Sequence, residues 1–146
     1  MYEQCTALWA SMDVAIMSAA VADYRPEQVA ENKIPHREQT LQLSLASCPD
    51  IAKALGTTKR TDQLLVGFAL ETGNGLENAQ RKLLQKNMDL CVLNTLADVG
   101  AGFCSNTNKT TFVYADGRTE ARPLELKTEL SKAIAHSVAQ MLIKRS

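Results

Sequence analysis

The sequence is poor in aromatic residues and carries no excess of charge. Phe, Trp and Tyr make up 5% of its 146 residues, and sixteen Lys and Arg balance sixteen Asp and Glu. A neutral chain lacks the bulk positive potential of a nucleic-acid binder or of a polybasic membrane anchor. Few aromatic residues also argue against a platform on which bases stack. We therefore expect neither a nucleic acid nor a membrane as partner, although a local basic patch for a phosphorylated small molecule is compatible with this balance.

Long hydrophobic runs and metal-ligand spacings are also missing. No stretch approaches the roughly 18 apolar residues of a transmembrane helix, and residues 1–5 lack the basic start of a signal peptide. The four cysteines form no CxxC pair and the two histidines stand in no ligand spacing, which argues against structural zinc. Phosphate loops of the GxxxxGK[ST] or GxGxxG kind, Ser-His-Asp arrangements and HExxH motifs are absent. We expect a cytoplasmic protein with reduced thiols.

What the sequence does contain is an alternation of buried strands and helices. Continuous apolar runs at 13–21, 63–70 and 88–93 predict parallel strands covered on both faces, and alternation at 41–45 predicts a half-buried strand. Helical spacing is found at 1–11, 49–55 (ended by Gly56), 76–86 and 126–144. Asp116-Gly117 predicts a hairpin between 110–114 and 119–124, and the polar residues 27–40 predict a long exposed loop. Residues 1–146 therefore read as a single α/β domain, Rossmann-like and layered, with a mostly parallel sheet and an appended antiparallel hairpin.

Ligands of open parallel sheets bind at the carboxyl ends of the strands, and two predicted strand ends carry suitable residues. Small side chains at 18–22 let a ligand approach the backbone, and Asp23 follows them. Asp23 can bind a metal or a ribose hydroxyl, or it can cap a tight turn. Phe68, in the second apolar run, can pack on a flat ring or simply belong to the core.

Three lysines are candidates for binding phosphate. Lys82 and Lys86 are four residues apart and share one helix face. They either hold an anion between them or belong to a solvated surface. The same choice applies to Lys33 in the polar loop, which can close over phosphates as lids do. Together with Asp23, these lysines suit a metal–polyphosphate ligand.

Residues 19–26, AAVADYRP, resemble a signature of the phosphopantothenoylcysteine synthetase family, the phosphopantothenate–cysteine ligases of coenzyme A synthesis. In many bacteria this enzyme is the C-terminal half of a bifunctional flavoprotein. Further matches follow in the order of the family and cover nearly the whole chain: Lys33-Ile34, 49–51, 66–72, Lys82, Lys86-Asn87, Asp89 and Asn94.

The resemblance implies a two-step ligation. The family activates the carboxylate of 4′-phosphopantothenate with a nucleotide, CTP in the bacterial type, and releases pyrophosphate. The amine of cysteine then attacks the acyl-cytidylate. Mg²⁺ and lysines neutralise the triphosphate, FMN belongs only to a fused decarboxylase half, and the family forms homodimers.

The resemblance also implies a nucleotide site. Lys33 would cover the phosphates and act in catalysis, Asp23 would bind the ribose–phosphate region or the metal, Phe68 would pack by the nucleotide, and Lys82 and Lys86 would hold phosphates. The full implied set is Met17, Ser18, Ala19, Asp23, Lys33, Pro49, Asp50, Ile51, Ala52, Phe68, Lys82 and Lys86.

The sequence departs from the family in three places. Residues 33–37, KIPHR, stand where the family often has Lys-x-Lys-Lys, and Cys48 stands where an Asn often precedes Pro-Asp-Ile. The first strands of the family, with a Gly-Gly-Thr turn and an asparagine that handles the acyl intermediate, have no counterpart here. We therefore expect a truncated domain that retains much of the nucleotide site and is inactive alone. The alternative is a non-catalytic nucleotide-binding or assembly module; a sugar- or flavin-binding protein is a third reading.

Overall fold

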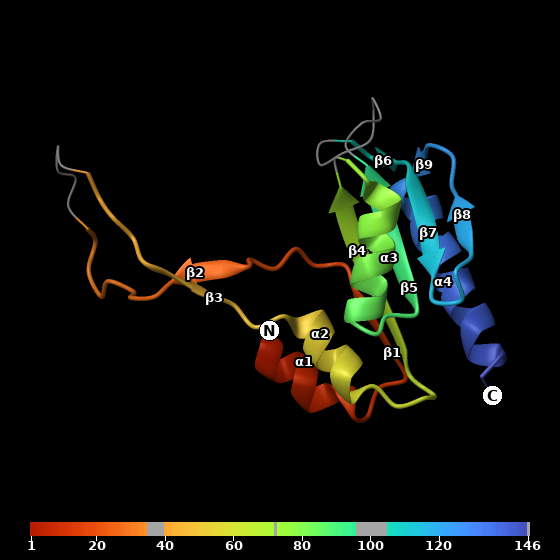
Figure 1. Ribbon diagram of the computed structural model, residues 1–146, viewed down its shortest axis with the longest axis horizontal. Coiled ribbons are helices and arrows are strands. Elements are labelled where there is room, and N and C mark those ends of the chain that lie inside the picture. Colours follow the sequence, from red (N-terminus) through yellow and green to blue (C-terminus); the bar gives the residue numbers. More distant parts are fainter. Residues whose placement is uncertain (35–39, 72, 96–104, 146) are drawn as a thin grey trace.

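A five-stranded sheet between two layers of helices forms the body of the protein (Figure 1). The computed structural model describes residues 1–34, 40–71, 73–95 and 105–145. In sheet order, the strands are β1 (Val14–Met17), β4 (Leu64–Glu71), β5 (Leu90–Thr95), β7 (Thr110–Tyr114) and β8 (Thr119–Ala121). The helices are α1 (Tyr2–Trp9), α2 (Ile51–Thr58), α3 (Gly75–Gln85) and α4 (Lys127–Ile143).

The pairing of the strands confirms the predicted α/β class. β1, β4 and β5 are parallel to one another, whereas β7 is antiparallel to β5 and β8 to β7. The β7–β8 hairpin therefore extends the same sheet. Its turn contains Asp116-Gly117 as predicted, and Gly117 adopts a φ of 87°, a conformation that glycine accepts without a steric penalty.

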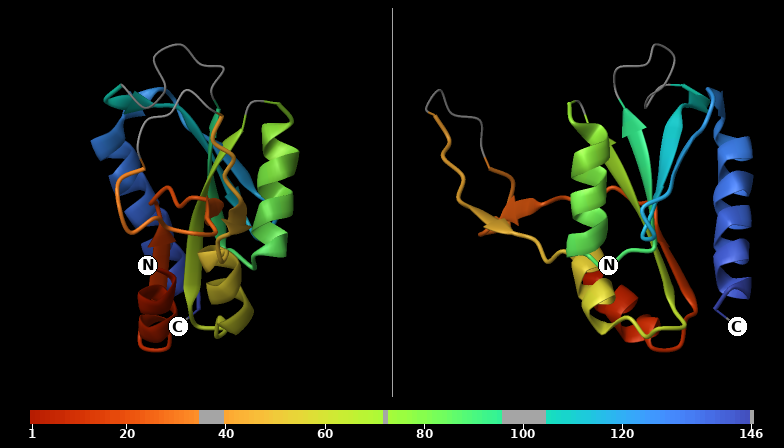
Figure 2. Two further views of the ribbon diagram at one scale, coloured as in Figure 1. Left: turned by 90° about the vertical axis from the view of Figure 1, so that its left-hand side faces the viewer. Right: turned by 45° about the vertical axis from the view of Figure 1, so that its right-hand side comes forward.

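Two apolar clusters cover the two faces of the sheet. Because successive residues of a strand point to opposite faces, Leu65 and Ala69 pack toward α1, α2 and α3, while Leu64 and Val66 pack toward α4. Figure 2 shows α3 and α4 on opposite sides of the sheet. Burial on both sides explains the continuous hydrophobicity of β4 and β5. In β1, which is an edge strand, the coverage predicted on both faces is incomplete, because Ile16 is 45% exposed.

Several predicted boundaries are wrong, and tertiary contacts explain one of them. β1 ends at Met17 instead of continuing to 21, and the strand predicted at 41–45 is found as β3 at Leu45–Ser47. Helix α2 passes through Gly56 and ends at Thr58. A side chain at Gly56 would lie 1.8 Å from the carbonyl oxygen of Lys86, so this glycine serves a close approach of the backbones and not a helix end.

A two-stranded arm leaves the body between β1 and α2. Its strands, β2 (Tyr24–Pro26) and β3 (Leu45–Ser47), are antiparallel. The arm projects away from the sheet (Figures 1 and 2), and the backbone N–H of Cys48 donates to the carbonyl oxygen of Asp23 at its base, over 2.7 Å. Its apolar side chains are largely exposed: Tyr24, Val29, Ile34, Leu41, Leu43 and Leu45. Residues 35–39, with Pro35, His36 and Arg37, lie outside the described residues.

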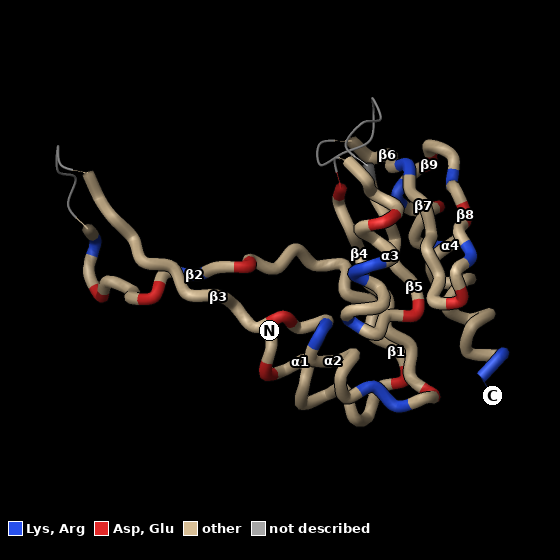
Figure 3. Tube along the Cα trace, in the orientation of Figure 1, with Lys and Arg blue, Asp and Glu red and all other residues tan. Residues whose placement is uncertain are grey.

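Two short strands, β6 (Thr107–Asn108) and β9 (Glu125–Leu126), pair beside the start of α4. Among the described helices, none is long and apolar enough to cross a membrane. Basic and acidic residues are interspersed along the trace (Figure 3), as the neutral balance predicts.

Candidate functional site

A pocket of about 430 Å³ opens at the carboxyl ends of β1 and β4. Its wall is made by the segment after β1, the start of α2, the end of β4 and the last turn of α3. Most of the predicted nucleotide-site residues line it together: Met17, Ala19, Asp23, Pro49, Asp50, Ile51, Ala52, Phe68, Lys82 and Lys86. Four chain segments thus supply one cavity at the edge where ligands of such sheets bind.

Two predicted residues are not part of the pocket lining. Ser18 follows β1, and its backbone N–H donates to the carbonyl oxygen of Ile16 over 3.1 Å. Lys33 is exposed and lies on the arm beyond β2. The role of Lys33 as the catalytic lysine thus stays a prediction.

Lys82 is held by a carboxylate at the end of β4. Its Nζ lies 2.6 Å from Oε1 of Glu71, and Nδ2 of Asn78 donates to Oε2 of the same carboxylate over 3.0 Å. Hydrogen bonding from Lys82, reinforced by its charge and by Asn78, lowers the pKa of Glu71 despite the opposing effect of desolvation. Glu71 does not line the pocket, so it holds the lysine from outside the cavity.

Lys86 is held in the same way from the start of α2. Its Nζ lies 3.0 Å from Oδ2 of Asp50, and Oδ1 of Asp50 accepts a hydrogen bond from the backbone N–H of Lys53. Asp50 is therefore the N-cap of α2 as well as the partner of Lys86. Desolvation raises the pKa of Asp50, but the hydrogen bonds from Lys53 and Lys86 outweigh it, so the pKa is lowered.

Phe68 has neighbours on two sides. Strand alternation turns its side chain toward α4, where it packs against the cluster that contains Phe112 and Leu130. Phe68 also lines the pocket. Both readings of this residue, as core and as pocket wall, are thus present in the structure.

The floor of the pocket contains residues that the sequence did not single out. Gly67 and Met88 both line the cavity, and a Cβ at Gly67 would lie 2.3 Å from Sδ of Met88. Met88 therefore occupies the space that the missing side chain leaves. A glycine inside a strand often marks such a close approach, which is the signal that was available in the sequence. Cys48 also lines the pocket.

Asp23 offers the pocket an exposed carboxylate. Within the described ranges, no group of three or more His, Cys, Asp or Glu side chains is arranged to hold a metal ion. Mg²⁺ commonly keeps several waters and binds through one or two carboxylates together with the phosphates of a ligand. The donor set thus fits a magnesium ion that arrives with a nucleotide, for which Asp23 would be the protein ligand.

Comparison with known proteins places this chain in a family. Residues 1–142 match the family described as DNA/pantothenate metabolism flavoprotein C-terminal domain. The chain belongs to this family. The coenzyme A biosynthesis bifunctional protein CoaBC of Bacillus subtilis is 36% identical over 141 residues, which cover 97% of this chain and 34% of that protein.

Other family relatives agree in fold and differ in name. A crystal structure of the C-terminal domain of CoaBC superposes with a TM-score of 0.78 at 34% identity and covers 98% of this chain and 61% of that one. A cysteine/cysteine sulfinic acid decarboxylase from an unknown prokaryotic organism is 39% identical over 130 residues, 89% of this chain and 36% of that protein. The chain thus spans about a third of these curated relatives. The Rossmann-like class predicted from the sequence is confirmed by the solved domain.

Proposed function

We propose that this chain carries the nucleotide site of a phosphopantothenate–cysteine ligase of coenzyme A synthesis, with CTP as the nucleotide. The observation that carries the proposal is the convergence of Lys82, Lys86, Asp23 and the start of α2 on one pocket. The similarity to CoaBC, a protein named for coenzyme A biosynthesis, supports the same reaction.

The proposed reaction requires a pocket that binds a triphosphate and stabilises its leaving group. In the first step, an oxygen of the 4′-phosphopantothenate carboxylate forms a bond to the α-phosphorus of CTP, and pyrophosphate leaves. In the second, the amine of cysteine bonds to the acyl carbon and loses a proton, and CMP leaves. Lys82 and Lys86 place two positive charges beside the phosphates, where negative charge must be neutralised.

The other residues orient the nucleotide. The first backbone N–H groups of α2, beginning at Ile51, favour an anionic or polar ligand atom. Mg²⁺, bound through Asp23, would supply further charge neutralisation of the triphosphate. Lys33 would approach the phosphates from the arm.

The direct test is pyrophosphate release from CTP, 4′-phosphopantothenate, cysteine and Mg²⁺. We expect the 146-residue chain to bind CTP without completing the ligation, because the described pocket residues are assigned to the nucleotide and the chain spans 34% of the relative named for coenzyme A biosynthesis. Robust turnover by the chain alone would contradict the proposed incompleteness and leave the proposed ligase activity intact.

The alternative is a non-catalytic nucleotide-binding or assembly module. Residues 33–37, KIPHR, motivate it, because they depart from the lysine pattern that the family often has at this point. Calorimetric titration with CTP and ATP separates the readings. CTP binding that Lys33→Ala weakens supports the ligase site, whereas no binding of either nucleotide leaves the assembly role.

We also propose that the arm mediates a homodimer. Leu41, Leu43 and Leu45 are 58 to 61% exposed on the arm, and exposed apolar surface of this kind marks interaction sites. Light scattering after size-exclusion chromatography is expected to show a dimer that the double variant Leu43→Ser, Leu45→Ser converts to a monomer. A monomeric wild-type chain at high concentration would refute this.

A further inference from the structure

The end of α3 has a conformation that places Lys86. The backbone N–H of Asn87 donates to the carbonyl oxygen of Leu84 over 3.2 Å, and that of Met88 donates to Leu83 over 2.9 Å. This pair of bonds is the Schellman ending of a helix, which requires a residue in the left-handed region. Asn87 fills that position with a φ of 50°, where glycine is more usual.

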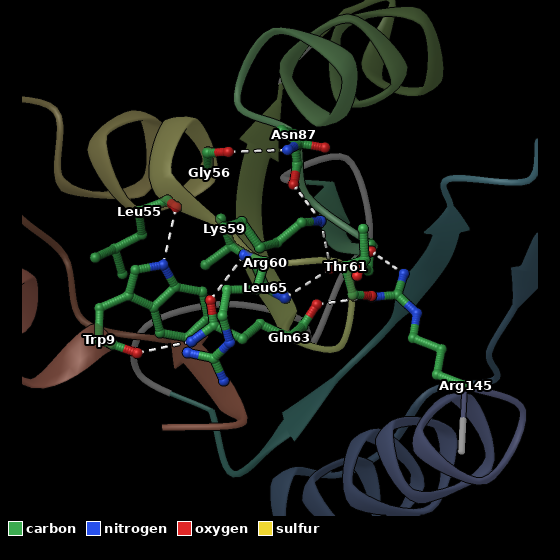
Figure 4. A network of polar contacts seen from close by, with 11 residues as sticks. Trp9, Leu55, Gly56, Lys59, Arg60, Thr61, Gln63, Leu65, Asn87 and Arg145 are labelled. Carbon is green, nitrogen blue, oxygen red and sulfur yellow. Dashed lines mark hydrogen bonds and ion pairs between the residues drawn. The ribbon is translucent and has the colours of Figure 1, made fainter. Parts of the chain in front are cut away.

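The side chain of Asn87 ties this helix end to α2. Its Nδ2 donates to the carbonyl oxygen of Gly56 over 2.8 Å (Figure 4). Gly56 permits the approach, because a Cβ there would lie 1.8 Å from the carbonyl oxygen of Lys86. The backbone of Lys86 is therefore in direct contact with the last turn of α2.

A buried ion pair fixes the other side of Asn87. Nζ of Lys59 donates to the backbone carbonyl oxygen of Asn87 over 2.7 Å and to Oδ2 of Asp89 over 2.8 Å. Asp89 is 4% exposed and also accepts from Arg145 and from the backbone N–H of Leu65. Figure 4 shows these contacts as one network around the start of β4. Asn87 is thus held through its side chain, its carbonyl oxygen and its two neighbours in the chain.

Lys86 itself reaches the pocket from this fixed point. Its backbone contacts Gly56 near the end of α2, and its Nζ lies 3.0 Å from Oδ2 of Asp50 at the start of α2. We propose that Asn87 is a positioning residue, which locks the end of α3 against α2 so that the ammonium group of Lys86 is held in the pocket for the phosphates of the nucleotide. This inference rests on the proposed function for its ligand, and it adds a residue outside the pocket to the binding apparatus.

The variant Asn87→Gly tests the role without endangering the fold. Glycine accepts the left-handed φ, so the Schellman ending is kept while the bond to Gly56 is lost. Titration of the full chain with CTP and Mg²⁺ is expected to show about five- to tenfold weaker binding, as for the loss of a bond that orders a charged ligand group. A Lys86→Ala background is expected to abolish most of this effect, because the lysine on which Asn87 acts is then absent.

A readout that needs no nucleotide separates this proposal from the proposed function. Lys86 lowers the pKa of Asp50 in part, so a displaced Lys86 raises that pKa. Carboxyl ¹³C NMR titration of Asp50 in Asn87→Gly is expected to show the rise. If the wild-type chain binds no CTP but Asp50 still shifts, the nucleotide function fails and the positioning role stands.

Matched variants complete the experiment. Gly56→Ala, which forces the two backbones apart, is expected to weaken CTP binding at least as much, and Gly73→Ala, where a Cβ meets nothing within 4 Å, is expected to leave it unchanged. The positioning role is overturned if Asn87→Gly leaves both CTP affinity and the pKa of Asp50 as they are in the wild type. It is also overturned if Asn87→Gly weakens CTP binding equally with and without Lys86.

Discussion

At the scale of single residues, the pocket is shaped by side chains that do not enter it. Glu71 binds Lys82 from outside the pocket, and Asn87 fixes Lys86 through a hydrogen bond to the backbone of α2. These contacts join residues from different elements, so no local sequence pattern predicts them. The family resemblance includes Glu71 and Asn87 in its matched segments, but their role in orienting the lysines follows only from the packing of the helices.

Gly67→Ala is expected to weaken CTP binding by closing the floor of the pocket. The new Cβ would lie 2.3 Å from Sδ of Met88, so the methionine has to shift. Because both residues line the cavity, we expect calorimetry to show about tenfold weaker binding. The melting temperature is also expected to fall, since overpacking costs about 1–3 kcal/mol. The double variant Gly67→Ala, Met88→Ala is expected to recover affinity; failure to recover would place the loss elsewhere.

Asp89→Asn is expected to destabilise the fold. It leaves Lys59, whose side chain is 8% exposed, beside a neutral group in a buried position. Removing one partner of a buried pair costs about 3–5 kcal/mol, and urea unfolding measures this loss as a lower midpoint. Asp116→Asn, which removes an exposed ion pair with Arg118, is the matched control and is expected to change stability by less than about 1 kcal/mol. Equal effects of the two variants would contradict the role of the buried pair.

At the scale of elements, a buried glutamine helps to attach α1 to the body. Gln63 is 1% exposed, and its Nε2 donates to the carbonyl oxygens of Trp9 and Met12, over 2.7 and 2.6 Å. Trp9 Nε1 in turn donates to the carbonyl oxygen of Leu55 in α2 over 3.0 Å (Figure 4). Gln63 thus gives a donor to the carbonyl oxygen of Met12 and a second donor to that of Trp9, which also accepts from the backbone N–H of Met12.

Gln63→Ala is expected to loosen this attachment. The carbonyl oxygen of Met12 loses its donor from Gln63, and that of Trp9 keeps only the backbone N–H of Met12, which together costs roughly 1–3 kcal/mol. Trp9 is the single tryptophan and is 4% exposed, so its fluorescence reports on the packing of α1 against α2. We expect a red shift of emission before the global unfolding transition in urea. Coincident transitions by fluorescence and by far-UV circular dichroism, as in the wild type, would contradict a separately loosened α1.

The elements also show how far sequence patterns reach. Continuous apolar runs predicted the three parallel strands. Burial on both faces of the sheet accounts for this pattern in β4 and β5, whereas β1 is only partly buried. The same logic fails for β2, since Pro26 lies in an exposed arm where no core imposes a pattern. It fails again at Gly56, because the close approach of Lys86, thirty residues later in the chain, requires this glycine. The glycine does not end the helix that contains it.

At the scale of the whole molecule, the candidate site followed from residues that share one cavity once the sheet has formed. Asp23, Asp50, Phe68 and the two lysines of α3 were predicted because a family resemblance links them, and the pocket brings them together. The placement of Lys33 could not be derived in this way, because Lys33 is exposed on an arm where no core fixes its position. The positions of residues that share a cavity are thus easier to predict than the position of a segment that has no core of its own.

Acid is expected to destabilise the whole domain in a defined pH range. The folded-state pKa values of Asp50 and Glu71 are lowered, while their unfolded values are near about 4. A carboxyl with a lowered folded pKa stabilises the fold above the unfolded value, and this contribution is lost as the pH falls through the folded value. Urea midpoints are therefore expected to be constant between pH 7 and about 5.5 and to fall below about pH 4. In Glu71→Gln the fall is expected to be smaller; an unchanged profile would contradict the assignment to this group.

The arm also determines which parts of the chain tolerate a change in length. The two ends of the arm are joined by the hydrogen bond between Cys48 and Asp23. The structure of the body therefore does not depend on the length of the arm beyond that bond. The entropy of closing such a loop grows with the logarithm of its length, about 0.6 kcal/mol for each doubling. Insertions or deletions beyond β2 and β3 therefore leave the sheet and the pocket nearly unaffected. The same change between Glu71 and Gly75 would separate a carboxylate from its lysine, so relatives that differ in length are expected to differ in the arm.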